Sequence, residues 1–136
     1  MYWKLRRVFA TDQVIDLIPI DLGLPDEELG FGECFDFVIT PHGQRREAGR
    51  ISLRLGESEA MYYFGHIGYH VDPPYRGNHF AARACRLLKP LLEITEKTDI
   101  VITCDPDNAP SKKTIESLGC ELENEVPVPL RLQKRW

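Results

Sequence analysis

The feature that most constrains the fold is the passage from a strand-like run into a helix at residues 67–81. The run Ile-Gly-Tyr-His-Val at 67–71 is typical of a strand, and the two prolines that follow end it because they offer no N–H to a neighbouring strand. A helical pattern opens after Arg76 and Gly77. The start of a helix leaves backbone N–H groups unpaired and carries partial positive charge, so this junction is suited to binding a phosphate.

An antiparallel meander is predicted before this junction. Alternating or continuous apolar runs bounded by turn residues predict three strands, at residues 35–40, 47–55 and 61–71. Residues 2–9 are a candidate earlier strand. Residues 11–30 fit either a short helix or a strand that ends at Pro19, with loop on either side of residues 24–29.

The pattern changes to helical spacing after the junction. A helix is predicted over residues 79–96, with a kink at Pro90, and a short buried strand over residues 99–104. A second helix begins at the N-cap Asn108 and stops at Gly119, before a last strand near residues 120–126. The sequence therefore predicts an α/β (α+β) fold, in which an antiparallel meander is followed by a parallel βαβ unit.

Composition limits the class of protein. A chain of 136 residues fits a single domain spanning 1–136, and its net charge of −4 argues against a general nucleic-acid binder. There is no apolar run of membrane-spanning length and no secretory leader, so we expect neither a membrane protein nor a secreted one. The four cysteines match no zinc-binding spacing, which predicts no metal site and a reducing, cytoplasmic location.

The junction also resembles the phosphate-binding signature of the Gcn5-related N-acetyltransferase (GNAT) family. That signature reads Arg or Gln, two residues, Gly, any residue, then Gly or Ala. Arg76 fits the first position and Ala81 the last, whereas His79 stands where the family usually has its middle glycine.

A second resemblance follows in the right order. After the parallel strand the family has an Asn, a small residue three positions on and then Leu-Gly, which here are Asn108, Ser111 and Leu118-Gly119. The resemblance covers roughly residues 47–122. It implies a GNAT-type central mixed sheet. The chain departs from the family in its reduced N-terminal helical region, because residues 10–34 hold at most one short helix and a loop.

The resemblance implies acetyl-CoA as cosubstrate and an amine as acceptor. It places the cofactor phosphates on the backbone N–H groups of Arg76, Gly77, Asn78, His79, Phe80 and Ala81. It places the pantetheine arm against the end of the preceding strand and the start of the second helix, at Tyr69, His70, Val71, Asn108 and Ser111.

The catalytic groups are less defined. Many family members have a tyrosine that protonates the CoA thiolate at the position of Ile115, so Tyr69, Tyr75, Ser111 or a water remain alternatives for this role. His66 and His70 are predicted on one face of the third strand, and His66 is the candidate base because it lies further from the turn. The competing interpretation of His66 is a strand histidine satisfied by a neighbour.

The prediction for function is an acetyl-CoA-dependent N-acetyltransferase acting on an amine of a small molecule or peptide. One alternative is a non-catalytic acyl-CoA-binding or regulatory domain of the same fold, favoured by Ile115 and the short N-terminal region. A generic nucleotide binder is disfavoured because there is no Gly-x-x-x-x-Gly-Lys-Ser/Thr run. The slim acceptor side predicts either an open site or one completed by a second subunit of a homodimer.

Overall fold

The computed structural model describes residues 9–25, 33–55, 65–94, 100–104 and 107–119. Within them, a five-stranded antiparallel sheet has its strands in the order in which they occur in the chain. The strands are β1 (Ala10–Thr11), β2 (Ile15–Pro25), β3 (Glu33–Pro41), β4 (Gly49–Arg54) and β5 (Ile67–Val71). The helical elements are η1 (Pro73–Tyr75), α2 (Phe80–Leu87), α3 (Lys89–Ile94) and α4 (Ala109–Ser117).

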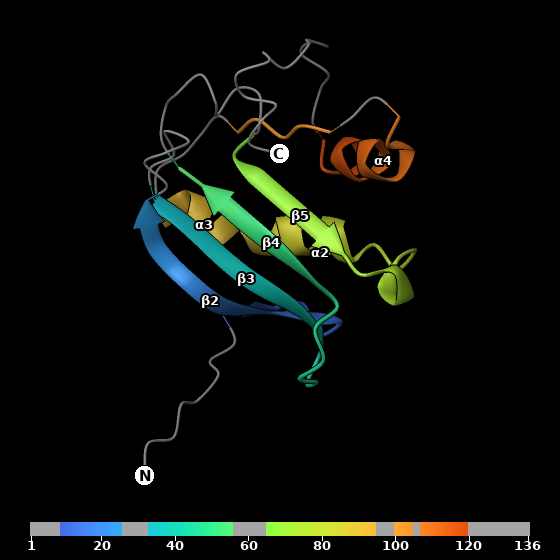
Figure 1. The fold of residues 1–136 in the computed structure, drawn as a ribbon, viewed down its shortest axis with the longest axis horizontal. Coiled ribbons are helices and arrows are strands. Elements are labelled where there is room, and N and C mark those ends of the chain that lie inside the picture. Colours follow the sequence, from blue (N-terminus) through green and yellow to red (C-terminus); the bar gives the residue numbers. More distant parts are fainter. Residues whose placement is uncertain (1–8, 26–32, 56–64, 95–99, 105–106, 120–136) are drawn as a thin grey trace.

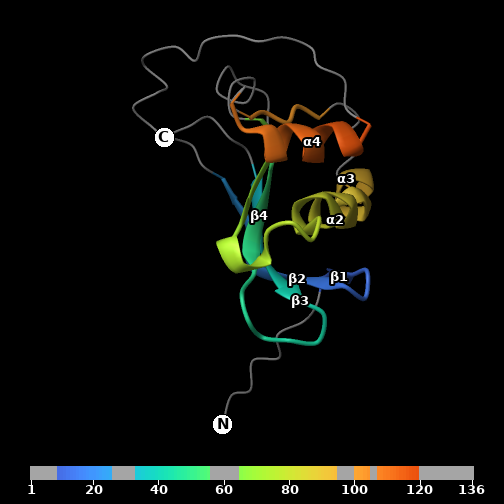
Figure 2. The ribbon, with the colours of Figure 1, turned by 90° about the vertical axis from the view of Figure 1, so that its right-hand side faces the viewer.

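The helices lie on one side of the sheet (Figures 1 and 2). Helices α2 and α3 pack against one face, and α4 contacts α2 beside the β5 edge of the sheet. The core fills the space between the sheet and α2. Its fully buried side chains include Phe37, Ile39, Ile51, Leu53 and Leu88. Burial of each such apolar side chain contributes about 1.5–3 kcal/mol, so this single layer of contacts holds the helices in place.

The meander predicted from the sequence is confirmed for β3 and β4. In β4, Ile51 and Leu53 are buried and Arg50 is exposed, as the alternation predicts. The third strand is shorter than predicted. It begins at Ile67 because Gly65, with φ of 82°, bends the chain just before it. Residues 61–64 of the predicted strand lie outside the described residues.

Strand β2 occupies the segment for which the sequence allowed a helix or a strand. It does not stop at Pro19 but continues to Pro25, because the register against β3 shifts between Pro19 and Asp21. A proline is tolerated at such a bulge, where a regular ladder hydrogen bond is not required. Residues 9–25 thus form strands and turns and contain no helix.

The helix predicted over residues 79–96 is interrupted at the predicted place. Helix α2 ends at Leu87 and α3 begins at Lys89, immediately before Pro90. A proline inside a helix removes one backbone hydrogen bond and clashes with the preceding turn, which explains the break. Residues 95–96 lie outside the described residues.

The parallel βαβ unit is not confirmed in detail. Among the described residues, the segment 100–104 pairs with β5 through an isolated parallel bridge between Ile67 and Ile102. The strand predicted near residues 120–126 lies outside the described residues, as does most of the candidate strand at 2–9. The predicted helix after Asn108 is confirmed as α4.

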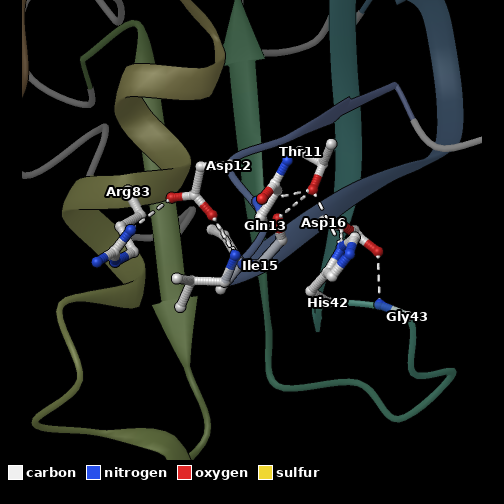
Figure 3. A network of polar contacts seen from close by, with 9 residues as sticks. Thr11, Asp12, Gln13, Ile15, Asp16, His42, Gly43 and Arg83 are labelled. Carbon is white, nitrogen blue, oxygen red and sulfur yellow. Dashed lines mark hydrogen bonds and ion pairs between the residues drawn. The ribbon is translucent and has the colours of Figure 1, made fainter.

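A polar network joins the β1–β2 turn to α2 (Figure 3). Asp12 Oδ1 accepts hydrogen bonds from the N–H groups of Val14 and Ile15, at 2.9 and 2.8 Å, and its Oδ2 lies 2.9 Å from Arg83 Nη1. Burial raises the pKa of Asp12, but the hydrogen bonds from Ile15 and Arg83 outweigh it, so the pKa is lowered. The network therefore fixes the first turns of α2 against the sheet.

Asp16 holds the β3–β4 turn in the same way. Its carboxylate is buried, with Oδ1 2.8 Å from His42 Nδ1 and Oδ2 accepting the Gly43 N–H at 3.0 Å. Burial raises the pKa of Asp16, and hydrogen bonds from His42, Thr11 and Gly43 more than reverse that effect. The folded protein therefore favours the ionised carboxylate.

We predict that Asp16→Asn lowers the free energy of unfolding by about 1–2 kcal/mol at pH 7. A depressed folded pKa contributes stability above the unfolded pKa of about 3.9, and this contribution is lost as pH falls through the folded pKa. The difference from wild type should therefore shrink between pH 5 and pH 3 in urea unfolding. Asp107→Asn, at an exposed aspartate, is the control. An equal loss at both pH values would show that the charge of Asp16 is not responsible.

Candidate active site

The outer edge of β5 presents backbone groups of two residues. At the two ends of the strand, Asp72 N–H donates to Ala48 O and Arg54 N–H donates to His66 O, both at 2.7 Å. Alternate residues of an antiparallel strand bond to the same neighbour, so the even-numbered residues here face β4. The backbone N–H and C=O groups of Tyr69 and Val71 therefore face the opposite edge, which we call the splayed edge.

The splay begins at a close contact between the start of β5 and Val101. His66 N–H donates to Val101 O at 2.7 Å, and Val101 N–H donates to His66 Nδ1 at 2.9 Å. A Cβ at Gly65 would lie 2.9 Å from Val101 O, so the close approach requires glycine. Beyond the Ile67–Ile102 bridge, residues 100–104 diverge from β5 (Figure 1).

The side chain of Tyr69 connects β5 to α4. Its hydroxyl oxygen lies 2.5 Å from Ser111 Oγ and 3.4 Å from Ser111 O. Burial is the main cause of a raised pKa at Tyr69, and the hydrogen bond with Ser111 partly offsets it. The phenol is therefore held protonated beside the first turn of α4.

The loop between η1 and α2 is held at both ends. The rings of Tyr75 and Phe80 stack with centroids 6.1 Å apart, and Asn78 Nδ2 donates to Tyr75 O at 3.1 Å. Arg76 Nε donates to Val71 O at 2.9 Å, so the arginine side chain lies next to the splayed edge. The exposed residues 76–79 thus form a fixed turn between the end of β5 and the start of α2.

The two helix starts near this edge differ. At α4, Asn108 Oδ1 accepts the Ser111 N–H at 3.2 Å and caps the helix, as the sequence predicts. At α2, the N-cap residue His79 makes no side-chain capping bond within the described part of the chain. The N–H groups of Phe80 and Ala81 belong to the first turn and have no acceptor in their own helix. The start of α2 therefore retains donors for an anion.

His79 adopts the backbone conformation that glycine favours. Its φ is 61° and its ψ is 24°, in the left-handed region. This conformation costs most residues about 1–2 kcal/mol, although histidine is found there more often than bulky residues are. The middle position of the signature thus requires a positive φ, and here a histidine meets that requirement.

The two histidines named from the sequence lie in different surroundings. His66 is buried at 4% exposure, outside the strand, with Nδ1 engaged by Val101. A neutral ring that accepts at Nδ1 carries its proton on Nε2, so His66 has no lone pair left for a base in this arrangement. His70 has a side chain 62% exposed, with Nε2 3.1 Å from Asp72 Oδ1. The two histidines therefore differ in burial and in partners, although the chain keeps one register from His66, opposite Arg54, to His70, opposite Arg50.

Most of the other predicted site residues gather around the splayed edge. Tyr69 and Ser111 touch, Arg76 reaches Val71, and the loop 76–79 leads into α2. The side chain of Phe80 is in the core, so only its backbone is available to a ligand. Among the residues that the structure describes, no group of three or more His, Cys, Asp or Glu side chains is arranged to hold a metal ion. None of the described helices has the length and apolar character needed to cross a membrane.

Within the described residues, these features place a helix start without a side-chain cap next to a strand edge that is unpaired beyond the Ile67–Ile102 bridge. The acetyltransferase (GNAT) domain model matches residues 8–121, which is most of the chain. The chain therefore belongs to the GNAT acetyltransferase family. Comparisons with curated proteins and with solved structures give no match.

We predict that His79→Val lowers the free energy of unfolding by about 1–2 kcal/mol, because a β-branched residue is strongly disfavoured at positive φ. His79→Gly should leave stability within about 1 kcal/mol of wild type, since the relief of strain offsets the greater freedom of the unfolded chain. Chemical denaturation measures both. Arg45→Val, at an exposed residue without positive φ, is the matched control. Equal stability of the Val and Gly variants would contradict the left-handed assignment.

Proposed function

We propose that the chain is an acetyl-CoA-dependent N-acetyltransferase that acts on an amine of a small molecule or peptide. The observation that carries this proposal is the uncapped start of α2 next to the splayed edge of β5. The start of α2 suits a pyrophosphate. The splayed edge suits an amide-containing chain that extends from that pyrophosphate. Their adjacency in one family member favours an acyl-CoA over other phosphate-bearing ligands.

The chain's own groups fit such a ligand in a definite order. The N–H groups of residues 77–81 and the guanidinium of Arg76 would hold the phosphates. The backbone groups of Tyr69 and Val71 would pair with the pantetheine amides. The backbone of His70 faces β4, so any contact from this residue would come from its side chain. Asn108 and Ser111 would border the same path from the start of α4.

The proposed reaction is direct attack of an amine nitrogen on the thioester carbonyl, followed by cleavage of the carbon–sulfur bond. A backbone N–H of the splayed edge would polarise the carbonyl, because fixed donors stabilise the negative charge that develops on the oxygen. The rest of the rate increase would come from holding the two reactants in one place.

The proton lost by the amine needs an acceptor. His66 was the sequence-based candidate, but its Nδ1 already binds Val101. His70 is better placed, because its ring is exposed on β5 and Asp72 orients it through Nε2. This orientation would leave Nδ1 to take the proton, so we assign the role of general base to His70.

We expect His70→Gln to lower kcat/KM by about 10²-fold while leaving CoA affinity near that of wild type. The acid limb of the wild-type pH profile, where a protonated base is inactive, should be lost in the variant. Asp72→Asn keeps the ring but removes its orienting carboxylate, so it should give an intermediate loss. An unchanged acid limb in a folded His70→Gln protein would exclude this histidine as the base.

Calorimetry with CoA tests the cofactor site directly. Gly77→Asp should weaken CoA binding at least tenfold, roughly 1.4 kcal/mol, because a carboxylate would face the pyrophosphate. Gly77 has φ of 85° and open space where a Cβ would lie, so Gly77→Asn imposes the same backbone strain without the charge. The Asn variant should bind CoA more tightly than the Asp variant. Equal affinities would place the phosphates elsewhere.

The alternative function is a non-catalytic acyl-CoA-binding domain. It is favoured by Ile115, which stands where many family members have a tyrosine that protonates the CoA thiolate. Release of free thiol from acetyl-CoA in a broad amine screen would support the enzyme. Binding of CoA without turnover across such a screen would support the non-catalytic acyl-CoA-binding domain. Tighter binding of ATP than of CoA would favour a generic nucleotide binder instead.

A further inference from the structure

We propose that the Tyr69 hydroxyl is the general acid that protonates the sulfur of CoA as it leaves. This inference rests on the proposed function and adds a residue to its mechanism. It follows from where β5 places the backbone and the side chain of a single residue. The backbone of Tyr69 faces the splayed edge, and its phenol reaches Ser111 at the start of α4.

The position of the phenol follows from the pairing of β5. Tyr69 lies opposite Ile51, which is fully buried, so both side chains point to the helix-covered face of the sheet. From there the hydroxyl extends to α4, where its oxygen lies 2.5 Å from Ser111 Oγ. A thioester whose carbonyl oxygen accepts the N–H of Tyr69 or Val71 would have its sulfur next to the Tyr69 ring.

The other side chains considered for the acid are less suited on geometry or chemistry. Tyr75 stacks on Phe80 in the loop and belongs to the phosphate end of the site. Ser111 is an aliphatic alcohol and too weak an acid to protonate a thiolate by itself. Ile115 lies one helical turn after Ser111, on the same face of α4, and carries no proton to donate. Tyr69 on β5 therefore brings a phenol to the part of α4 where Ile115 replaces the family's tyrosine.

The proton balance is simple. The amine nitrogen forms a bond to the carbonyl carbon and loses one proton to the base, and the carbon–sulfur bond breaks as Tyr69 gives its hydroxyl proton to the sulfur. The products are the amide and the free thiol of CoA. Solvent then restores the phenol through Ser111, whose hydroxyl can both donate and accept.

The surroundings keep the phenol in its acid form. Burial raises the pKa of Tyr69, and Cys85 on α2 and Cys104 on the 100–104 segment raise it further. Ser111 and Thr114 on α4 act in the opposite sense. The raised pKa keeps the phenol protonated at neutral pH, so its proton is present when the carbon–sulfur bond breaks.

The decisive test replaces Tyr69 by 3-fluorotyrosine, whose phenol has nearly the same shape and is more acidic. If the phenol acts as the acid, the alkaline limb of the kcat profile moves to lower pH by the difference in acidity. A merely structural phenol would not move this limb, and neither would titration of Cys85 or Cys104. An unmoved limb would overturn the proposal.

Tyr69→Phe provides a second readout that does not depend on turnover. The wild-type protein should bind CoA more tightly than desulfo-CoA, which lacks the thiol, because the hydroxyl contacts the sulfur. In Tyr69→Phe this preference should disappear, while affinity for desulfo-CoA stays unchanged. Its kcat should fall by about 10²-fold. A preference for CoA that survives the substitution would contradict the contact.

Two further variants separate this role from others. Tyr75→Phe keeps the ring that stacks on Phe80, so it should lower kcat less than Tyr69→Phe does. Ser111→Ala removes the partner of the phenol and should lower kcat less than Tyr69→Phe does. Failure of the wild-type protein to bind CoA would overturn both the function and this inference. Full activity of Tyr69→Phe in a protein that binds CoA would overturn the inference alone.

Discussion

The contact between the start of β5 and Val101 is the constraint on which the site depends. His66 binds both backbone groups of Val101, and Gly65 lets the two segments approach closely enough for this to happen. Because the contact is confined to the beginning of β5, the remainder of the strand has no paired neighbour on that side among the described residues. This contact and the Ile67–Ile102 bridge hold residues 100–104 at the start of β5, and the hydrogen bond between Tyr69 and Ser111 holds the helix that follows.

Strand β5 separates several tasks along five residues. Its even-numbered residues use their backbone to complete the sheet, and Tyr69 and Val71 keep theirs for the splayed edge. Its side chains point alternately to the helix-covered face and to the other face, so Tyr69 and His70 approach the same point of the strand from opposite sides. In the proposed mechanism, this short strand would bring an acid and a base to one thioester without placing them in contact with each other, where they would exchange the proton directly.

Local signals in the sequence predicted the elements that local physics controls. The prolines after β5, the cap at Asn108 and the break before Pro90 are all effects of a residue on its own backbone, and each was found where predicted.

The passage of β2 through Pro19 depends on a register shift against β3, which no single segment reveals. The partner of His66 could not be predicted for a similar reason. Alternation along the strand does not reveal the burial of His66, which depends on a long-range contact with Val101. The contact between Tyr69 and Ser111 joins residues far apart in the chain and has no signal in either segment alone.

The two helix starts have different thermodynamic consequences. Helix α4 carries its own cap in Asn108, so its first turn does not need a bound ligand for capping. Helix α2 has no such side chain among the described residues, and a bound phosphate would take the place of the cap. A ligand that binds only the folded state stabilises it in proportion to the logarithm of its concentration. The resistance of α2 to local unfolding would then rise and fall with the supply of acyl-CoA, and its proteolytic lifetime with it.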